Sequence, residues 1–541
     1  MQVGIRLHPP PLKRLRLVLA TMGIATAMVC ASLAQGQEQP NLEALSRIAS
    51  EATARSRLLE TASYLTDIYG PRLTGSPHLR AAGAFVVQRL KDWGVSTARL
   101  ERWGPFGPGW TTDRFIALAV SPVPYPLIAY PKAWTPGTEG SVVANAVLAV
   151  IETQRDFDTY RGRLKGTFVL TAPARSAAAR RSPRPRDPRY SNDELRALTQ
   201  ADSPLAGLPS RPTQADLEFT RKRMEFFIDE GVVALLEPGG EGGAVFVGDG
   251  RLRDDAAFAG QGFYPWPDAV AAQVVVATEQ YDRIARTLEK RIPVTLEVDI
   301  ANNYHPAEPD SFNIIAEIPG TDLASQIVMI GAHFDSWHAG TGATDNAAGC
   351  AVMLEAMRIL QATGLKMRRT VRLALWTGAE QGRLGSRAYV THHFADPATM
   401  ELKPDHPRLS AYFNLDGGTG AIRGLYLQGN VAATPTFERW LAPFKGKGVS
   451  TVSPRITHDG DHGAFDAVGL PGFDFMQDPA ALQIRHSNLD TFDQLNASDL
   501  IQNAVIVASL TYQAANHDNP LPRKPLPPPD KDAAGPWSPG R

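Results

Sequence analysis

One histidine and two aspartates, His333, Asp335 and Asp345, lie in a loop rich in glycine and alanine and could bind a metal ion. The loop follows an apolar run over residues 327–330, which predicts a buried strand, and it precedes apolar residues at helical spacing over residues 350–360. Loops at the carboxyl ends of strands are where open α/β sheets bind their ligands. Imidazole and carboxylate groups suit zinc and similar divalent ions. An ordinary polar loop would also explain these three residues, so the rest of the chain must decide.

Three more candidate ligands, Glu380, Asp416 and His486, each follow an apolar run that predicts a strand. Any one of them alone would more often be a surface acid or a hydrogen-bonded histidine. Together with His333 and Asp345, they give two histidines and three carboxylates at the ends of strands. Five such groups, one of them bridging, can hold two divalent ions about 3.5–4 Å apart, which is the geometry of two-metal hydrolysis.

The elements that must position these residues alternate between strand and helix after residue 300. Apolar runs bounded by turn residues predict strands, and the segments between several of them predict helices. The predicted strands span residues 313–318, 327–333, 370–377, 410–415, 424–427 and 472–476, and a helix over residues 498–514 closes the fold. This pattern predicts an α/β fold with a mixed, mainly parallel sheet flanked by helices.

The chain before residue 300 has a different pattern. Residues 41–95 predict two helices around a turn over residues 69–77, which is dense in glycine and proline. Short β-rich runs follow from about residue 105 to residue 300. Residues 175–189 carry six arginines, which could form a basic recognition segment, but the Ser- and Pro-rich sequence that follows favours a solvated surface loop. Residues 519–541 are rich in proline and predict an extended or disordered tail.

The first 34 residues have the pattern of a secretory signal peptide. Basic residues precede an apolar run over residues 17–33, and cleavage is expected after Ala34. The alternative is a membrane anchor, but the run is short for a span, and no later segment is long and apolar enough. Cleavage would make the protein secreted or periplasmic and leave Cys350 as its only cysteine. Because Cys350 lies on the apolar face of a helix, we expect a core residue rather than a reactive thiol.

The length of the chain bounds its number of domains, and its net charge gives no indication of a nucleic-acid or membrane partner. With 541 residues, the chain is long enough for two or three domains. Its formal net charge of −1 provides no overall field that would attract nucleic acid or an anionic membrane surface. We therefore expect no nucleic acid as a partner and, after signal cleavage, no membrane span.

Five motifs give the sequence a resemblance to the clan MH zinc exopeptidases, the family of aminopeptidases and glutamate carboxypeptidases. The motifs are Gly-Ala-His333-Phe-Asp335-Ser-Trp-His, Gly-Ala-Thr-Asp345-Asn-Ala, Asn-Leu-Asp416-Gly, Asp461-His462-Gly-Ala-Phe-Asp-Ala-Val-Gly-Leu-Pro and Arg-His486-Ser-Asn. The resemblance covers most of residues 45–515 and, within the family, is greatest to the secreted carboxypeptidase Q group.

The resemblance implies a zinc peptidase domain of the phosphorylase/hydrolase-like fold that is interrupted by a β-rich protease-associated domain. The expected segments are a signal peptide (1–34), the two parts of the peptidase domain (35–117 and 297–518), the protease-associated domain (118–296) with its Arg/Pro-rich loop (173–212), and the tail (519–541). Whether the inserted domain caps the cleft, mediates a homodimer or binds another partner stays open at this point.

The resemblance also assigns the five candidate ligands to two ion sites that share one aspartate. Asp345 would bridge two Zn²⁺ ions. Glu380 and His486 would complete one site, and His333 and Asp416 would complete the other. The ligand types alone also fit Co²⁺ or Mn²⁺. The peptide bond that follows Asp345 would be cis, as is common after the bridging ligand in this family.

Two further side chains would support the reaction in a protein of this family. Asp335 would orient His333 by accepting its ring N–H. His462 would donate a hydrogen bond to the transition state. The equally weighted alternative is that His462 only packs beside Asp461.

The sequence departs from the family at the residue that activates water. The family carries two adjacent glutamates before a Gly-x-x-Gly-Ser turn, of which the first is the general base and the second is a metal ligand. In this chain the turn begins at Gly382, which puts Glu380 on the ligand and Ala379 on the base. A slip by one residue would make Gln381 a ligand, but a neutral amide binds zinc poorly and the slip breaks the glycine spacing. A positioned base contributes roughly 10²–10⁴-fold to the rate, so we expect weakened activity.

The resemblance therefore predicts a secreted di-zinc exopeptidase of the aminopeptidase, carboxypeptidase or dipeptidase type. It would hydrolyse a peptide bond near a chain end of a peptide or dipeptide through metal-activated water. The competing hypothesis is a catalytically inactive homologue that holds the same metals and binds peptides or a protein partner. Ala379 favours the second hypothesis, whereas the complete ligand set favours an enzyme.

Overall fold

Seven segments of the chain are described by the computed structural model, namely residues 39–175, 189–200, 213–240, 242–249, 270–307, 309–458 and 460–530. Residues 42–541 form one unit, and residues 1–41 form another, of which only residues 39–41 are described. The predicted signal peptide, residues 1–34, lies outside the described segments. Within them, no helix is long and apolar enough to cross a membrane.

The first of two large sheets carries the candidate ligands near its strand ends. Its strands are β1 (Arg99–Trp103), β10 (Ser311–Ile318), β11 (Leu323–His333), β12 (Arg369–Trp376), β15 (Leu409–Asn414), β16 (Ile422–Tyr426), β17 (Thr451–Ser453) and β18 (Gly472–Gln477). They lie in the order β1–β10–β12–β11–β15–β18–β16–β17. The pairs β12–β11, β11–β15, β15–β18 and β16–β17 are parallel, and the other three pairs are antiparallel. The prediction of a mixed, mainly parallel α/β sheet is confirmed.

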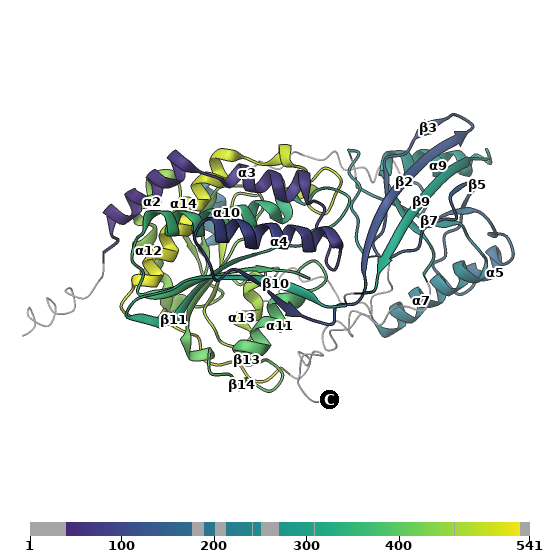
Figure 1. The fold of residues 1–541 in the computed structure, drawn as a ribbon. Coiled ribbons are helices and arrows are strands. Elements are labelled where there is room, and N and C mark those ends of the chain that lie inside the picture. The colour runs from purple at the N-terminus through teal and green to yellow at the C-terminus, as the bar shows by residue number, and fades with distance from the viewer. Residues whose placement is uncertain are drawn as a thin grey trace, which may run out of the picture. The chain divides into compact units, whose positions relative to one another are not determined.

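Helices cover both faces of this sheet (Figure 1). One face packs against α2 (Leu42–Arg55), α3 (Leu58–Ser63), α4 (Pro77–Asp92), α10 (Ala348–Thr363), α12 (Thr434–Leu441) and α14 (Ala497–Asn516). The other face packs against α11 (Leu384–His393) and α13 (His462–Asp466). Successive residues of β11 enter different cores, because Val328 and Ile330 pack with the first group and Ile327 and Met329 with the second. Strands buried on both faces explain the continuous apolar runs in the sequence.

Residues 41–95 form three helical segments, whereas the sequence predicted two. α2 ends at Arg55, and α3 begins at Leu58 and continues as a π-helical turn over Tyr64–Ile68. At the break, the backbone N–H of Arg57 donates to Glu355 Oε2 at 3.2 Å. A local contact also marks the break, because Ser56 Oγ accepts the backbone N–H of Leu58 at 3.3 Å, whereas Glu355 lies on α10, 298 residues away from Arg57.

The second sheet is formed by residues between β1 and β10 in the sequence. Its strands are β2 (Gly109–Ser121), β3 (Tyr125–Pro126), β4 (Ala129–Pro131), β5 (Ser141–Leu148), β6 (Phe168–Leu170), β7 (Ala234–Pro238), β8 (Gln273–Val276) and β9 (Thr295–His305), in the order β3–β2–β9–β5–β6–β7–β8–β4. The helices α5 (Asp156–Tyr160), α7 (Gln214–Asp229) and α9 (Thr278–Glu289) accompany it (Figure 1). The sheet has a core of its own, which includes Phe168, Leu236, Val274 and Leu296.

Short elements complete the described part of the chain. They are α6 (Asn192–Leu198), the hairpin of β13 (Ala395–Asp396) and β14 (Glu401–Leu402), and short 3-10 helices over His406–Arg408, Val431–Ala433, Ala442–Lys447, Leu482–Ile484 and Phe492–Gln494. The segment Ala343–Ala347 is a kinked turn in which Asp345 and Asn346 have non-helical backbone dihedrals.

Two segments without predicted structure make specific contacts. At the described end of the Arg/Pro-rich loop, Arg189 donates to Asp478 and Asp499 at 3.0 Å each. In the tail, Leu521 is 3% exposed and Arg523 donates to the carbonyl oxygen of His406 at 3.0 Å. These contacts attach both segments to the first sheet and its helices, whereas residues 176–188, 201–212 and 531–541 lie outside the described segments.

A buried ion cluster joins α2 to α10. Arg358 donates to Glu355 Oε1 and Oε2 at 2.8 and 2.9 Å and to Glu51 Oε1 at 2.7 Å. The three side chains are 8%, 1% and 5% exposed, in that order. Arg55 also contacts Glu51, at 2.6 Å, but its side chain is 76% exposed. The carboxylate of Glu51 therefore binds one buried arginine, Arg358, and one exposed arginine, Arg55.

We expect Arg358→Ala to lower the free energy of unfolding by about 3–5 kcal/mol, because Glu355 would keep a buried charge without its cation and Glu51 would keep only the exposed Arg55. The control Arg55→Ala should cost less than about 1 kcal/mol, because water already screens that pair. Urea denaturation followed by tryptophan fluorescence compares the two variants. Losses of similar size would show that burial does not decide the strength of these ion pairs.

Candidate metal centre

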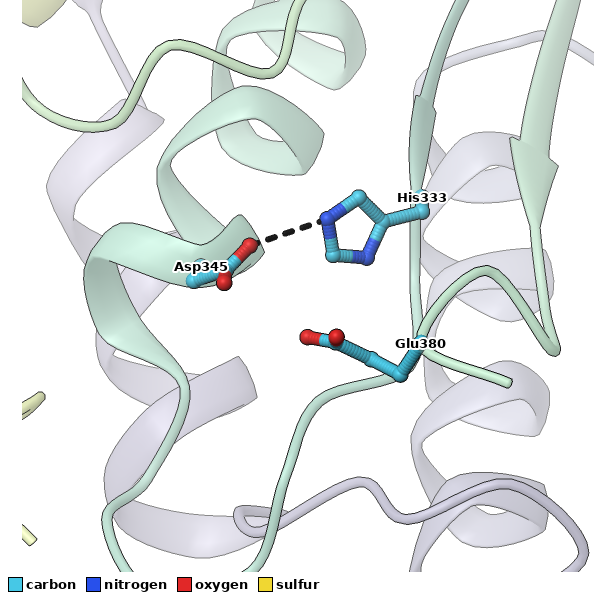
Figure 2. A group of neighbouring side chains, drawn as sticks. All are labelled: His333, Asp345 and Glu380. Carbon is cyan, nitrogen blue, oxygen red and sulfur yellow. Dashed lines mark hydrogen bonds and ion pairs between the residues drawn. The ribbon is translucent and has the colours of Figure 1, made fainter. Parts of the chain in front are cut away.

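The five predicted metal ligands come together at the carboxyl ends of the parallel strands. His333 is the last residue of β11, Asp345 precedes α10, Glu380 follows β12, Asp416 follows β15, and His486 lies in the loop after β18. Figure 2 shows His333, Asp345 and Glu380 pointing toward one another. One ligand atom of each of these three residues lies within 4.8 Å of the others. Groups far apart in the sequence therefore form one cluster.

Asp345 connects the two halves of this cluster. Its Oδ1 lies 3.0 Å from His333 Nε2, and its Oδ2 lies 2.8 Å from His486 Nε2. Asp416 Oδ1 is 3.2 Å from His333 Nε2, and Glu380 Oε2 is 3.1 Å from His486 Nε2. We call His333, Asp416 and Asp345 Oδ1 the His333 half-site. We call His486, Glu380 and Asp345 Oδ2 the His486 half-site.

The oxygens of the His486 half-site are suited to a cation. Glu380 Oε1 and Asp345 Oδ2 are buried, and no described residue gives either atom an aligned hydrogen bond. A buried carboxylate oxygen without a donor is unfavourable, and a bound metal ion would satisfy it. Zinc bonds of about 2.0–2.2 Å would put tetrahedral ligand atoms roughly 3.3–3.6 Å apart. The distances of 2.8 and 3.1 Å around His486 Nε2 are shorter than that spacing, so these side chains would move apart by a few tenths of an ångström around a zinc ion. Imidazole and carboxylate groups are the ligand types that zinc prefers, so the donor set fits zinc by its chemistry.

The electrostatics of the cluster favour positive charge. Burial lowers the pKa of His486, but the carboxylates of Glu380 and Asp345 outweigh burial and raise this pKa to about 10. Burial raises the pKa of Asp345, but the charge of Arg485 and contacts with the two histidines hold it well below its usual value. Burial and the nearby Asp345 raise the pKa of Glu380. The carboxylates of Asp345 and Glu380 are therefore crowded together and need cations between them.

The carboxylate of Asp335 does not orient His333 as predicted. Its Oδ1 is 4.0 Å from His333 Nδ1, which is too far for a hydrogen bond, and that nitrogen lies 3.0 Å from the backbone oxygen of Asp335 instead. The carboxylate accepts the backbone N–H groups of Ala379 and Glu380 at 3.1 and 3.2 Å, and the hydroxyl of Thr74 at 2.9 Å. The predicted contact is therefore wrong, and Asp335 positions the loop that carries Glu380.

A buried arginine holds the loop between His333 and Asp345. Arg72 donates to the carbonyl oxygens of Phe334, Thr341 and Gly342 at 2.8, 3.0 and 2.9 Å. The sequence did not predict this role of Arg72, because an arginine in a Gly- and Pro-rich turn is usually solvated. Only the folded chain brings this turn beneath the loop.

Asp490 holds the backbone of Asp345 itself. Its Oδ1 accepts the N–H of Thr344 at 2.6 Å, and its Oδ2 accepts the N–H of Asp345 at 3.2 Å. The peptide bond between Asp345 and Asn346 is cis, as the family resemblance predicted. Cys350 is buried and donates to the carbonyl oxygen of His333 at 3.0 Å, which confirms it as a core residue.

The turn after β12 supports the register that puts Ala379 in the place of the base. Gly382 has a φ of 117°, which favours glycine. A Cβ on Gly385 would lie 2.3 Å from the carbonyl oxygen of Thr377, so this position also needs glycine. The two glycines that define the turn are therefore fixed by the backbone, and Glu380 is the residue that reaches the cluster.

The contacts of the His462 side chain are with residues outside the metal-ligand cluster. Its side chain is buried, and its Nε2 lies 2.9 Å from Thr457 Oγ1. Burial lowers the pKa of His462 to about 4, so the ring is neutral near pH 7. Among the described residues, none of the five predicted ligands makes a hydrogen bond or ion pair with it. These contacts favour a packing role over a hydrogen bond to a transition state.

A loop from the second-sheet region holds the segment that carries His486. The N–H of Val247 donates to the carbonyl oxygen of His486 at 3.0 Å. Asn488 accepts the N–H of Val245 at 2.7 Å and donates to the carbonyl oxygen of Gly243 at 3.3 Å. His486 has a φ of 62°, which is uncommon for a residue other than glycine. The backbone of this ligand is therefore held from residues 243–247.

The comparisons with known proteins agree with this site. Residues 313–511 match peptidase family M28. The chain carries a peptidase family M28 domain. Carboxypeptidase Q of Homo sapiens is 24% identical over 494 residues, with 89% of this chain and 90% of that protein covered.

Two solved structures share the fold. A peptidase M28 precursor from Shewanella amazonensis SB2B has a TM-score of 0.61 and 22% identity, with 90% of this chain and 98% of that chain covered. A zinc aminopeptidase from Bacillus subtilis has a TM-score of 0.52 and 17% identity, with 85% and 95% covered. The α/β architecture is therefore that of the M28 zinc peptidases.

We expect Asp490→Ala to weaken Zn²⁺ binding by roughly 10–100-fold, because Asp345 would lose the contact that fixes its backbone. The variant should also lose about 2–4 kcal/mol of stability, because two buried N–H groups would lack an acceptor. Competition with a chelator and urea denaturation measure the two effects. Asp493→Ala, at an exposed position three residues away, is the control and should change neither. Unchanged zinc affinity in Asp490→Ala would contradict this role.

Proposed function

We propose that this protein is a secreted zinc-dependent exopeptidase that hydrolyses a peptide bond near one end of a peptide or dipeptide. The observation that carries the proposal is the cluster of two histidines and three carboxylates around Asp345 within an M28 domain. Carboxypeptidase Q and the Bacillus subtilis zinc aminopeptidase are exopeptidases by name, and they attack opposite chain ends. We therefore assign the class of reaction without assigning the chain end.

Both half-sites have ligands for a divalent ion, which gives the site a capacity of two Zn²⁺ ions. His486, Glu380 and Asp345 would hold one ion, and His333, Asp416 and Asp345 would hold the other. Zinc bound at these residues would supply an acidified water and a Lewis acid for the scissile carbonyl.

The side chains around the ligands have separate tasks in this proposal. Asp335 fixes the backbone of Ala379 and Glu380 through two N–H bonds, so that Glu380 faces His486. Asp490 fixes Asp345 through its backbone. Ala379 has no group that accepts a proton. The proton of an attacking water must therefore leave without the carboxylate that the family provides, and the reaction should be slow.

A second candidate function is an inactive homologue that uses the same site to bind peptide ends. The observation that favours it is Ala379, because loss of a positioned base removes roughly 10²–10⁴-fold of rate. The site would still bind the carbonyl or amino group of a peptide end through its metal. Both candidate functions require bound metal, but only the exopeptidase would turn over a peptide substrate.

We also propose that residues 118–296 form a protease-associated domain inserted into the peptidase domain, which comprises residues 35–117 and 297–518. The second sheet with its own core supports an inserted domain. The sequence pattern of residues 1–34 supports a signal peptide and export, to the outside of the cell or to the periplasm.

The zinc-loaded protein should cleave dipeptides or aminoacyl amides slowly, and Ala379→Glu should raise kcat by about 10²–10⁴-fold, because it restores a proton acceptor beside the metal. Ala379→Gln is the matched control, because it has similar size but no basic oxygen, and it should not raise kcat. Release of amino acids from a panel of substrates measures both variants against the wild type.

The outcomes separate the hypotheses. Absence of turnover in the wild type with turnover in Ala379→Glu would favour the peptide-binding function. Equal turnover in all three proteins would show that residue 379 does not occupy the place of the base. Absence of turnover in all of them, with zinc bound, would contradict the exopeptidase proposal.

A further inference from the structure

The guanidinium of Arg485 lies inside the His333 half-site. Its Nη2 is 2.7 Å from Asp345 Oδ1 and 2.9 Å from Asp416 Oδ1. Its Nη1 donates to the backbone oxygen of Asp416 at 3.2 Å. A guanidinium with hydrogen bonds to two carboxylates and a carbonyl is firmly placed. Arg485 directly precedes the ligand His486, and nothing in the sequence pattern predicted this contact.

Arg485 uses the same two oxygens as His333. The Nε2 of His333 lies 3.0 Å from Asp345 Oδ1 and 3.2 Å from Asp416 Oδ1. Each of these oxygens therefore has two nitrogen partners, which is the number of lone pairs that a carboxylate oxygen offers. An ion in this half-site would need Asp345 Oδ1 at about 2.0–2.2 Å, because Asp345 Oδ2 faces His486, so it would compete with Arg485 for that oxygen.

The His486 half-site is different. Asp345 Oδ2 and Glu380 Oε1 have no aligned hydrogen bond from any described residue, and no arginine contacts them there. The two halves of the cluster thus differ in one respect. An arginine occupies the His333 half-site, whereas the carboxylates of the His486 half-site face the ligand His486 and keep two buried oxygens without an aligned hydrogen bond.

The charge of Arg485 is permanent, so it cannot make room for an ion by losing a proton. Its side chain is 27% exposed, which leaves it a path toward solvent. A second ion can therefore enter only if the guanidinium swings out of the half-site. Moving the guanidinium breaks its three hydrogen bonds, and that cost reduces the affinity for the second ion.

We propose that Arg485 takes the place of one metal ion, so that the protein tightly binds a single Zn²⁺ in the His486 half-site and binds a second only after Arg485 is displaced. This inference rests on the proposed metal centre. In place of two equivalent ions, the cluster would hold one Zn²⁺ and the guanidinium of Arg485, which contact different oxygens of Asp345.

The number of Zn²⁺ ions per chain tests this inference without any activity measurement. The full-length mature protein is stripped with a chelator, equilibrated at a buffered free Zn²⁺ concentration that saturates the first site, and analysed by elemental mass spectrometry. The wild type should hold one ion per chain, and Arg485→Met should hold two, because its side chain has similar length and no charge. Arg383→Met is the matched control, because Arg383 donates to His458 and Gly460 rather than to the cluster, and it should hold one.

Two ligand variants assign the ion to a half-site. In the wild-type background, His333→Ala should keep one ion and His486→Ala should lose it. In the Arg485→Met background, His333→Ala should reduce the count from two ions to one. Circular dichroism checks that each variant is folded, and the double variant keeps the test valid if one single variant is not.

The results that overturn the inference differ from those that overturn the metal centre. Two ions of similar affinity in the wild type, one ion in Arg485→Met, or loss of the single ion in His333→Ala would each overturn the role of Arg485. Absence of bound zinc from the wild type and from Arg485→Met would overturn the metal centre itself.

Discussion

The sharing of Asp345 between the two half-sites is the interaction on which the rest of the site depends. One of its oxygens faces His333 and Arg485, and the other faces His486. Three carboxylates within reach of one another repel unless positive groups lie between them. The histidines and Arg485 supply some of that charge, and a metal ion would supply the rest. The loops of the site therefore hold the carboxylates of Asp345, Glu380 and Asp416 at short range, beside the positive groups that offset their repulsion.

The support for this arrangement comes from parts of the chain that are remote in sequence. Arg72 and Thr74 come from the turn before α4, and Asp490 comes from the loop before α14. Residues 243–247 come from the second-sheet region and hold the backbone around His486. His333 ends a strand and the other four ligands lie outside regular strands and α-helices, where these contacts hold the backbone in place. Loss of residues that support metal ligands in this way typically weakens metal binding by about 10–100-fold.

Much of this site could be predicted from the sequence, because its ligands follow strands with clear apolar runs. Strands β11, β12 and β15 end within one residue of the predicted positions, so His333, Glu380 and Asp416 were expected at one edge of the sheet. The resemblance to a known family supplied the pairing of the ligands, and the geometry around Asp345 has the same pairing.

The features that the sequence did not predict all depend on contacts between distant residues. The family resemblance assigned the carboxylate of Asp335 to the ring of His333, but the N–H groups of Ala379 and Glu380 and the hydroxyl of Thr74 bind it instead. The contacts of Arg485 were not predicted, because its partners Asp345 and Asp416 lie 140 and 69 residues away. The break between α2 and α3 likewise depends on Glu355. Local patterns describe strands and helices well, but they do not describe which buried polar groups meet.

The adjacency of Arg485 and His486 has a consequence for the order of events on the ribosome. A ribosome makes a chain from its N-terminus, so the carboxylates of Asp345, Glu380 and Asp416 are all present well before either of these two cations. Arg485 contacts the carboxylates of the His333 half-site and His486 contacts those of the other half-site, and the two emerge together. Until then His333 is present beside Asp345 and Asp416, but the His486 half-site lacks its histidine. The centre is therefore completed only when the C-terminal segment arrives, after the second-sheet region that receives it has already been made.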